Sequence, residues 1–494
     1  MKPDVRPKSC SSVAEALDAY RDVQRSHAGL KRFFERWTAD PGFKKELEVA
    51  PDRALASSNI RIDVADIAWL LDRDVPESSA SPPPPVRTMW EIAMSKMRWV
   101  RRFYHEEAVP DAAGIRAWRN RQLARQRFDL GPFHADSNIH SSLAVELTDG
   151  CSVGCWFCAL DPTSLRRTFL DTDDNRRLWD ALLANLGRVL GSGLRSGFLY
   201  WATDPFDNPD YEAFCLDFHA KTGVFPPTTT ALAMRDPART RRLLAMSEER
   251  GCWLNRFSLP TLSLMRQVHR EFDAEELAQV ECLPLNPQAN LAYGNAGRFR
   301  RRALENPRLL AEQDRKLRRS PWHASDPQYR DSSDYANGSI GCVTGFLVNL
   351  CRREVRLASP CTASPDWPLG SIVFSRERFS DEDDLGNAIS RIADRHFRAG
   401  LRSSETVRFQ DYVSTNPTPQ GFVVTGRFRQ QRLIERPDMP AAIQLVGRLI
   451  EDGRWSAEEI ADQVANEHRL VPATIRALLD EIFEEGLIHE RPLP

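Results

Sequence analysis

Apolar residues in the first part of the chain recur at spacings of three and four, which is the period of an amphipathic helix. The pattern runs from about residue 11 to residue 74 and includes Phe33 and Trp37. It predicts a small helical domain, which we assign to residues 1–75. The serine- and proline-rich stretch 76–85 that follows predicts an extended linker.

A second helical pattern spans residues 89–127 and mixes aromatic side chains with many arginines. Aromatic residues interleaved with arginine can bind nucleic acid or an acidic peptide. Such a stretch is more often an amphipathic helix with a solvated basic face, and we adopt this second interpretation. The linker and this helix together form a bridging segment, residues 76–136.

Strand-like and helix-like segments alternate from residue 138 onward, which predicts a parallel α/β sheet. Helical patterns at 176–190 and 236–249 separate some of the strands. The candidate strands are 143–147, 196–200, 228–233, 253–259 and 280–285. In parallel barrels, functional residues gather where the strands end, at the C-terminal rim.

Three cysteines follow the first of these strands with the spacing CxxxCxxC: Cys151, Cys155 and Cys158. Three thiolates can hold three irons of a 4Fe-4S cluster and leave the fourth iron open to another ligand. The alternatives are buried apolar cysteines, or a zinc site with a fourth ligand elsewhere. Zinc sites more often show paired CxxC motifs, and no second CxxC follows, so the spacing favours the cluster.

This motif resembles the signature of the radical SAM superfamily, CxxxCxφC with an aromatic residue at φ, which is Phe157 here. The resemblance implies a partial (β/α)6 barrel over residues 137–400, with a 4Fe-4S cluster and S-adenosyl-L-methionine (SAM) as cofactors. Four further positions match places where family members contact SAM, although the family's glycines after the second strand are missing. They are Thr203 and Asp204 after the second strand, and Arg256 and Ser258 in the fourth.

Two β-branched segments, 345–350 and 354–358, predict a hairpin in the C-terminal third of the chain. Its open end would hold Cys342 and Cys361, while Cys351 would lie a strand length away, roughly 20 to 25 Å. No cysteine follows Cys361, which favours a single cluster. Cys361 opens a loop directed toward the barrel mouth, so it is either a redox-active thiol or a buried structural cysteine. Cys342 is the second candidate for the thiol role.

The final segment, residues 401–494, predicts short strands followed by helices that start near Ala441, Ser456 and Pro472. Ser456 and Glu459 form a capping-box pattern. The order of elements is winged-helix-like, but the acidic helices would repel nucleic-acid phosphates. It resembles the leader-peptide recognition domains of enzymes that modify ribosomally made peptides, which capture an extended peptide as an added strand.

Length and composition narrow the class of protein. A chain of 494 residues suits two or three domains, and a formal net charge of −2 gives no global reason to expect nucleic acid. No apolar run approaches the roughly 20 residues of a membrane helix, and the charged N-terminus lacks a signal-peptide core. The ten cysteines are therefore expected to be reduced thiols or metal ligands in a cytoplasmic protein.

Taken together, the segments resemble radical SAM peptide epimerases of the proteusin type. The resemblance implies that a 5′-deoxyadenosyl radical removes a Cα hydrogen from an L-residue, and that the Cys361 thiol returns a hydrogen to the opposite face. The partners implied are a ribosomally made precursor peptide and an electron donor such as flavodoxin or ferredoxin, with neither membrane nor nucleic acid. Two alternatives stay open: a radical SAM enzyme that crosslinks peptides, and an iron-sulfur sensor or DNA-binding regulator.

Overall fold

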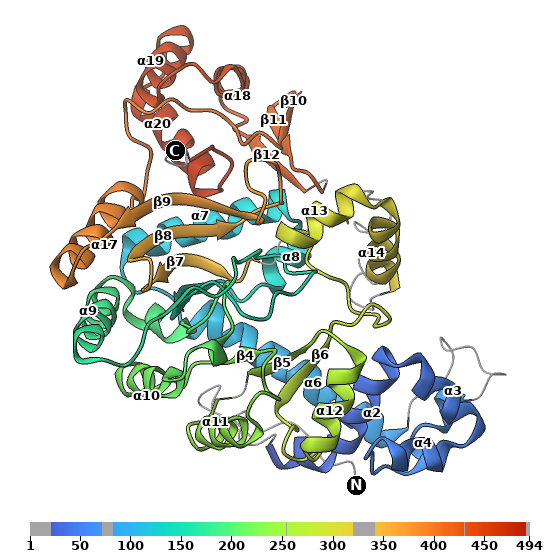
Figure 1. Ribbon diagram of the computed structural model, residues 1–494. Helices are drawn as coiled ribbons and strands as arrows, with labels where there is room; N and C mark the ends of the chain where they lie inside the picture. The colour runs from blue at the N-terminus through green and yellow to red at the C-terminus, as the bar shows by residue number, and fades with distance from the viewer. Residues whose placement is uncertain (1–20, 72–82, 253, 320–340, 429, 491–494) are drawn as a thin grey trace.

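The computed structural model describes residues 21–71, 83–252, 254–319, 341–428 and 430–490. It shows a mixed α/β protein with helices at the N-terminal end, a core of two sheets, and a C-terminal unit with its own small sheet (Figure 1). Residues 76–82 of the expected linker lie outside the described residues. Within the described part of the chain, no helix combines the length and apolar character needed to cross a membrane.

The N-terminal region is helical, as its periodicity predicts. Phe33, Leu47 and Ile67 form part of its apolar core, and the Asp40 carboxylate caps a helix by accepting from the Gly42 and Phe43 amides. The elements are α2 (Ala28–Ala39), α3 (Pro41–Val49), α4 (Pro51–Ser57), η1 (Val64–Asp66) and α5 (Ala68–Leu71).

The bridging segment forms α6 (Pro84–Arg102), a π-helical turn η2 (Phe103–Glu107), α7 (Ala113–Asp129) and α8 (Pro132–Ser137). The expectation of a solvated basic face is wrong for α7, whose Arg119, Arg121 and Arg125 are buried. Their guanidinium groups donate to backbone carbonyls from other parts of the chain, for example Arg119 Nη2 to Tyr104 O at 3.0 Å. Burial is possible because each buried charge finds such partners.

One core sheet contains β1 (Ser141–Glu146), β7 (Val343–Asn349), β8 (Glu354–Pro360) and β9 (Ser371–Arg378), in that order. Strands β7 and β8 are antiparallel with Gly345 opposite Ala358, so the expected hairpin is confirmed. Strand β1 is buried along its whole length and runs parallel to β7. The sequence pattern gave no indication of this pairing.

The other core sheet is parallel and consists of β4 (Thr229–Thr230), β5 (Asn255–Leu259) and β6 (Val280–Pro284). The expected strand at 196–200 is wrong: its start belongs to the 3-10 turn η3 (Gly191–Ser196), and only Phe198 forms a parallel bridge, to Ala144. Because this position supplies one bridge and no strand, the described strands do not close a barrel.

Helices surround the two core sheets (Figure 1). The expected helices are confirmed as α9 (Asp173–Leu190) and α11 (Pro237–Glu249). The remaining core elements are β2 (Thr148–Asp149), β3 (Arg167–Thr168), η4 (Pro205–Asp207), α10 (Tyr211–Thr222), α12 (Leu262–Glu271), α13 (Gly297–Glu305), α14 (Pro307–Arg319) and α17 (Glu382–His396).

The C-terminal unit has an antiparallel sheet followed by three helices, which matches the expected order of elements. Its apolar residues form a separate core cluster that includes Val446 and Leu479. The Ser456 and Glu459 capping box is confirmed, with both reciprocal hydrogen bonds present. The elements are β10 (Ser414–Thr418), β11 (Gly421–Thr425), β12 (Gln431–Glu435), α18 (Pro440–Asp452), α19 (Ala457–His468) and α20 (Pro472–Glu484).

Candidate active site

The three-cysteine motif forms a folded-back loop just after β1. Gly150 adopts φ +95°, and a Cβ on it would lie 2.3 Å from the Ser164 carbonyl oxygen. The Cys151 amide donates to Thr163 O at 3.0 Å, which closes the base of the loop. A glycine is therefore needed at position 150 for the chain to turn and pack against itself.

The three thiols are neither fully buried nor fully exposed. Burial raises the pKa of Cys151 to about 11. Burial, and then the nearby charges of Cys158 and Cys151, raise the pKa of Cys155 to about 12. Ligand thiols must lose their protons to bind a metal, so these cysteines would need a strongly bound cation to become thiolates.

The donor set fits an iron-sulfur cluster better than a single ion. Ligand sulfurs around one zinc ion stand about 4 Å apart, given Zn–S bonds of about 2.3 Å. The described residues contain one group of three His, Cys or acidic side chains with all ligand atoms within 4.8 Å, and it lies elsewhere: Glu35, His269 and Cys282. Cluster thiolates bind different irons and can stand farther apart than the ligands of one ion, so the three cysteines are compatible with a cluster.

The Glu35, His269 and Cys282 group lies where α2 packs on β6 and α12. A cation is already present there, because Lys31 Nζ lies 2.5 Å from Glu35 Oε1. His269 Nε2 lies 3.2 Å from Glu35 Oε2, and burial lowers the pKa of His269. The group is best described as a buried polar contact that fastens the N-terminal helices to the core.

Two charged residues that the sequence analysis missed hold the cysteine loop in place. The Asp207 carboxylate accepts from the Ser152 amide at 2.8 Å and from Ser152 Oγ at 2.5 Å. On the other side, Arg298 at the start of α13 donates to Cys155 O and Pro162 O, both at 2.9 Å, and to Asp161 Oδ1 at 3.0 Å. Both are ordinary charged residues in the sequence, so only their contacts identify them.

Phe157, the aromatic residue of the motif, packs the loop against the following helices. Its ring stacks on Tyr293 with centroids 4.9 Å apart and an interplanar angle of 20°. Its neighbour Trp156 also contacts Tyr293, at 5.3 Å. The aromatic position therefore anchors the loop, whatever the loop binds.

Asp204 lies near the cysteine loop, and its carboxylate is engaged by one side chain and two backbone amides. Its carboxylate oxygens accept from Thr230 Oγ1 at 2.7 Å, from the Ala231 amide at 2.7 Å and from the Phe206 amide at 3.0 Å. Burial raises the pKa of Asp204 to about 6. These bonds tie the turn to the end of β4, whereas Thr203 is half-buried in the same turn.

The sheet β4–β6 has one packed face and one face that solvent reaches. Phe257 and Cys282 are buried in an apolar cluster, whereas Arg256, Ser258 and Glu281 on the alternate positions are partly exposed. Arg256 Nε donates to Glu281 Oε2 at 2.7 Å, and the two side chains are 30% and 34% exposed. The accessible face of the sheet therefore carries polar and charged side chains together with Leu283.

The charges on this face shape its electrostatics. Although burial favours the neutral acid, Arg256 and then Lys96 hold the pKa of Glu281 down at about 2. Lys96 Nζ lies 3.8 Å from Glu281 Oε1. The Glu281 carboxylate therefore lies between two cations, Arg256 and Lys96.

Cys342 lies beside this accessible face. It packs in an apolar cluster with Phe198 and Tyr200 at the start of β7, and the Tyr200 hydroxyl is 2.7 Å from Thr229 Oγ1 on β4. Burial raises the pKa of the Cys342 thiol, and the nearby Arg256 charge opposes that shift. Cys342 and Arg256, two of the residues that the sequence analysis named, thus lie within electrostatic range of each other.

Cys361 stands at the same open end of the β7–β8 hairpin as Cys342, as expected, but it lies where the core meets the C-terminal unit. Its side chain is 3% exposed and its amide donates to Gly370 O at 2.9 Å. Burial, and then the negative charge of Asp129, raise the pKa of Cys361. The loop after Cys361 does reach the cysteine loop, because Ala363 packs with Ala159.

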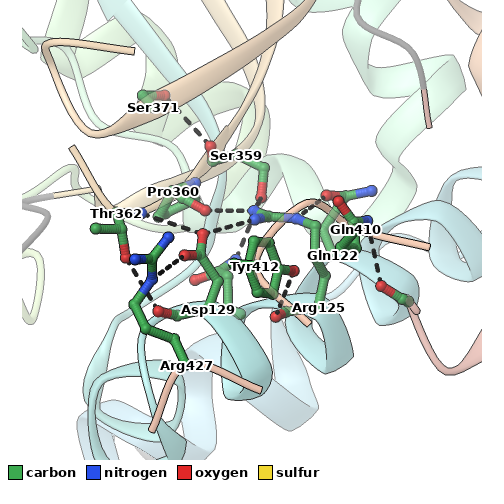
Figure 2. Close-up of polar contacts among 12 residues, drawn as sticks. Gln122, Arg125, Asp129, Ser359, Pro360, Thr362, Ser371, Gln410, Tyr412 and Arg427 are labelled. Atoms are coloured by element: carbon green, nitrogen blue, oxygen red, sulfur yellow. Dashed lines mark hydrogen bonds and ion pairs between the residues drawn. The ribbon is translucent and has the colours of Figure 1, made fainter. Parts of the chain in front are cut away.

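Figure 2 shows the polar contacts around this junction. Arg125 reaches from α7 to the end of β8, where it donates to the Pro360 carbonyl and to Ser359 Oγ at 3.2 Å. Asp129 accepts from Arg125 Nη1 and from the Thr362 amide, both at 3.1 Å. Cys361 is thus enclosed by a network of buried charges rather than by the accessible face of β4–β6.

Comparison with known proteins gives a single informative result. No protein-family model and no solved structure matches the chain. The chain is 30% identical over 480 residues to a protein of Sinorhizobium fredii (strain NBRC 101917 / NGR234) named Uncharacterized protein y4wI. The match covers 95% of this chain and 88% of that protein, so it extends over the core and the C-terminal unit.

Proposed function

The chain belongs to the same family as the Sinorhizobium fredii protein y4wI, and we propose that it is a radical SAM enzyme that epimerises residues of a ribosomally made peptide. The observation that carries the proposal is the cysteine loop. Cys151, Cys155 and Cys158 lie on one loop after a buried strand, and Asp207 and Arg298 hold that loop.

We assign a 4Fe-4S cluster to the three cysteines and SAM to the neighbouring polar face. When bound, these groups supply a 5′-deoxyadenosyl radical able to remove a Cα hydrogen. Arg256 and Ser258 would orient polar groups of SAM, since both are accessible on one face of the sheet. Asp204 would act indirectly, by fixing the turn that carries Thr203.

We also propose that residues 137–400 form a partial (β/α)6 barrel. Its support is the parallel run of β4, β5 and β6, together with the parallel bridge that joins β1 to Phe198. The accessible polar face would then be the inner face of the barrel, and the cysteine loop would lie where β1 ends. This arrangement fits the tendency of parallel barrels to collect functional residues at strand ends.

A thiol that returns a hydrogen atom must carry its proton. Burial raises the pKa of both Cys342 and Cys361, so both are S–H groups at neutral pH. Cys361 remains the thiol that the family resemblance favours. Cys342 packs in the same cluster as Tyr200, whose hydroxyl contacts Thr229 on β4, whereas Cys361 is enclosed at the junction. This placement supports Cys342 as the alternative donor.

The C-terminal unit would capture the peptide by strand addition. Strand β12 is at an edge of the sheet β10–β11–β12, and the Leu433 side chain on it is 49% exposed. Arg432 and Arg436 at this edge pair with Glu485 and Glu481 near the end of α20. An extended peptide could add its backbone to β12 and place side chains against these residues.

The test is to reconstitute the protein without oxygen and incubate it with SAM and the precursor peptide encoded nearest to it, in deuterated water. We expect 5′-deoxyadenosine and a solvent deuterium at each D-residue. A product with lost hydrogens and no deuterium would indicate crosslinking and contradict epimerisation.

Two cysteine variants then identify the hydrogen donor. Cys342→Ala and Cys361→Ala should both cleave SAM, but only the variant lacking the donor should fail to form D-residues. Cys215→Ala is the matched control, because Cys215 is a buried thiol in the main apolar core. If both variants still formed D-residues, neither Cys342 nor Cys361 alone would be the hydrogen donor.

A further inference from the structure

Helices α13 and α14 are strongly basic, although the protein as a whole is nearly neutral. Together they carry nine lysines and arginines against three acidic residues, whereas the whole chain has a formal net charge of −2. Their exposed arginines are Arg301, Arg302, Arg308, Arg315 and Arg318, and we call this surface the basic face. The two helices form one side of the molecule, between the C-terminal unit and the N-terminal helices (Figure 1).

Several charges of the basic face are available to a partner. Arg301 pairs with Asp161, and Arg318 pairs with Asp314. In the described parts of the chain, no acidic side chain lies within ion-pair distance of Arg302, Arg308 or Arg315. Such unpaired positive charge on one surface attracts acidic partners over a range set by ionic strength.

Helix α13, which carries part of the basic face, starts in contact with the cysteine loop. The Arg298 amide donates to Cys158 O at 2.9 Å, and its guanidinium donates to Cys155 O at the same distance. Helix α13 therefore starts in contact with two of the three cysteines. A protein that docks on this face would lie next to the loop.

An apolar recess lies under the same helices. A cavity of about 140 Å³ is lined by Trp156 of the cysteine loop, by Tyr293 and Phe299, and by Leu309 and Lys316 of α14. On the surface nearby, Leu304 of α13 is 64% exposed. Apolar side chains surrounded by charge are typical of the centre and rim of a protein interface.

We propose that the basic face is the docking surface for an acidic one-electron carrier protein, an inference that rests on the function proposed above. The carrier gives up one electron, becoming oxidised by one unit, and the cluster site gains that electron, with no bond made or broken. Docking beside Trp156 and Cys155 keeps the transfer distance short. Nucleic acid would satisfy the charge but would not need the contact with the cysteine loop.

The test is the affinity of a flavodoxin for the reconstituted protein, measured without oxygen at low and high ionic strength. The triple variant Arg302→Glu, Arg308→Glu and Arg315→Glu should bind at least about tenfold more weakly at low ionic strength. The matched control reverses three exposed arginines elsewhere: Arg61, Arg270 and Arg448. At about 0.15 M ionic strength, where the Debye length is about 8 Å, the control should bind within about twofold of the unmodified protein. At low ionic strength the control should lose less affinity than the triple variant, because its reversed charges lie away from the docking surface.

A second readout separates the docking surface from the proposed function. Dithionite needs no docking, so it should reduce the triple variant and the unmodified protein alike, as followed by absorbance. Equal flavodoxin binding by triple variant and control would overturn the docking surface while leaving the proposed function intact. Tight binding of an RNA with none of flavodoxin would also overturn it, and failure of the unmodified protein to hold iron would overturn both proposals.

Discussion

Two arginines hold the two cysteine-bearing loops of this protein, and they do so in different surroundings. Arg298 donates to carbonyls of the Cys151–Cys158 loop and keeps 21% of its side chain exposed. Arg125 donates to the Pro360 carbonyl next to Cys361, and its side chain is 2% exposed. Each arginine also pairs with an aspartate, Asp161 or Asp129.

The difference separates a loop that solvent can reach from a junction that is closed to solvent. A buried ion pair must satisfy all its polar atoms within the protein, so the Arg125 network leaves little room for a ligand. The Arg298 clamp fixes the backbone and leaves the three thiols partly accessible. Two similar arginine–aspartate pairs thus lie in a closed junction at Cys361 and in an accessible loop at Cys151–Cys158.

The largest effect is expected at the sealed junction. Replacing Arg125 with alanine leaves a buried Asp129 carboxylate short of a partner, which should lower the free energy of unfolding by about 3–5 kcal/mol. Denaturant unfolding measures the loss. Arg302→Ala on the surface should change stability by no more than about 0.5 kcal/mol, and a similarly small loss for Arg125→Ala would mean that the junction is not sealed.

A pair of glycines tests the rigidity of the open loop. Gly150→Ala should cost about 1–2 kcal/mol for its positive φ and a further 1–3 kcal/mol or so for crowding against Ser164 O. Gly154→Ala has a positive φ of +66° but open space around the new Cβ, so only about 1–2 kcal/mol is expected. Equal losses in thermal unfolding would show that the loop relaxes freely.

We expect the loss of the Arg298 side chain to reduce iron binding more than it reduces the stability of the fold. Arg298→Ala should lower the free energy of unfolding by about 1–2 kcal/mol, because solvent can replace some of its hydrogen bonds. Iron bound per chain after anaerobic reconstitution should fall markedly. Arg125→Ala is the control, measured at a temperature where it stays folded. If Arg125→Ala lost as much iron as Arg298→Ala, the two arginines would not have the different roles described above.

The smallest effect concerns the rates at which the thiols of the cluster-free, folded protein are alkylated. Iodoacetamide should modify Cys155 before Cys361, since exposure controls access to a thiol. Peptide mass spectrometry at successive times gives the order. Earlier labelling of Cys361 would mean that the junction opens more readily than the loop.

Local features of this fold could be predicted from the sequence. The capping box at Ser456 and Glu459, the β7–β8 hairpin and the helix α9 depend on neighbouring residues, and each is confirmed. The segment 196–200 has a strand-like composition, but it contributes only the Phe198 bridge. Its apolar residues are explained by burial alone, which does not distinguish a strand from an extended connection.

Features that depend on distant partners could not be predicted. The arginines of α7 look solvated in sequence because their acceptors lie far along the chain, as for Arg121 and Glu490 at a separation of 369 residues. Asp207 and Arg298 carry no local pattern that marks them as holding the cysteine loop. The three cysteines were found only because their spacing is itself the signal.

The parallel pairing of β1 with β7 constrains when a cofactor can be inserted. Glu146 at the end of β1 contacts Asn349, which is synthesised 203 residues later. Contacts so distant in sequence form late in folding. The strand that leads into the cysteine loop therefore gains its neighbour only after residue 349 has been synthesised. If the proposed cluster needs the complete sheet beside the loop, its insertion should follow the synthesis of β7.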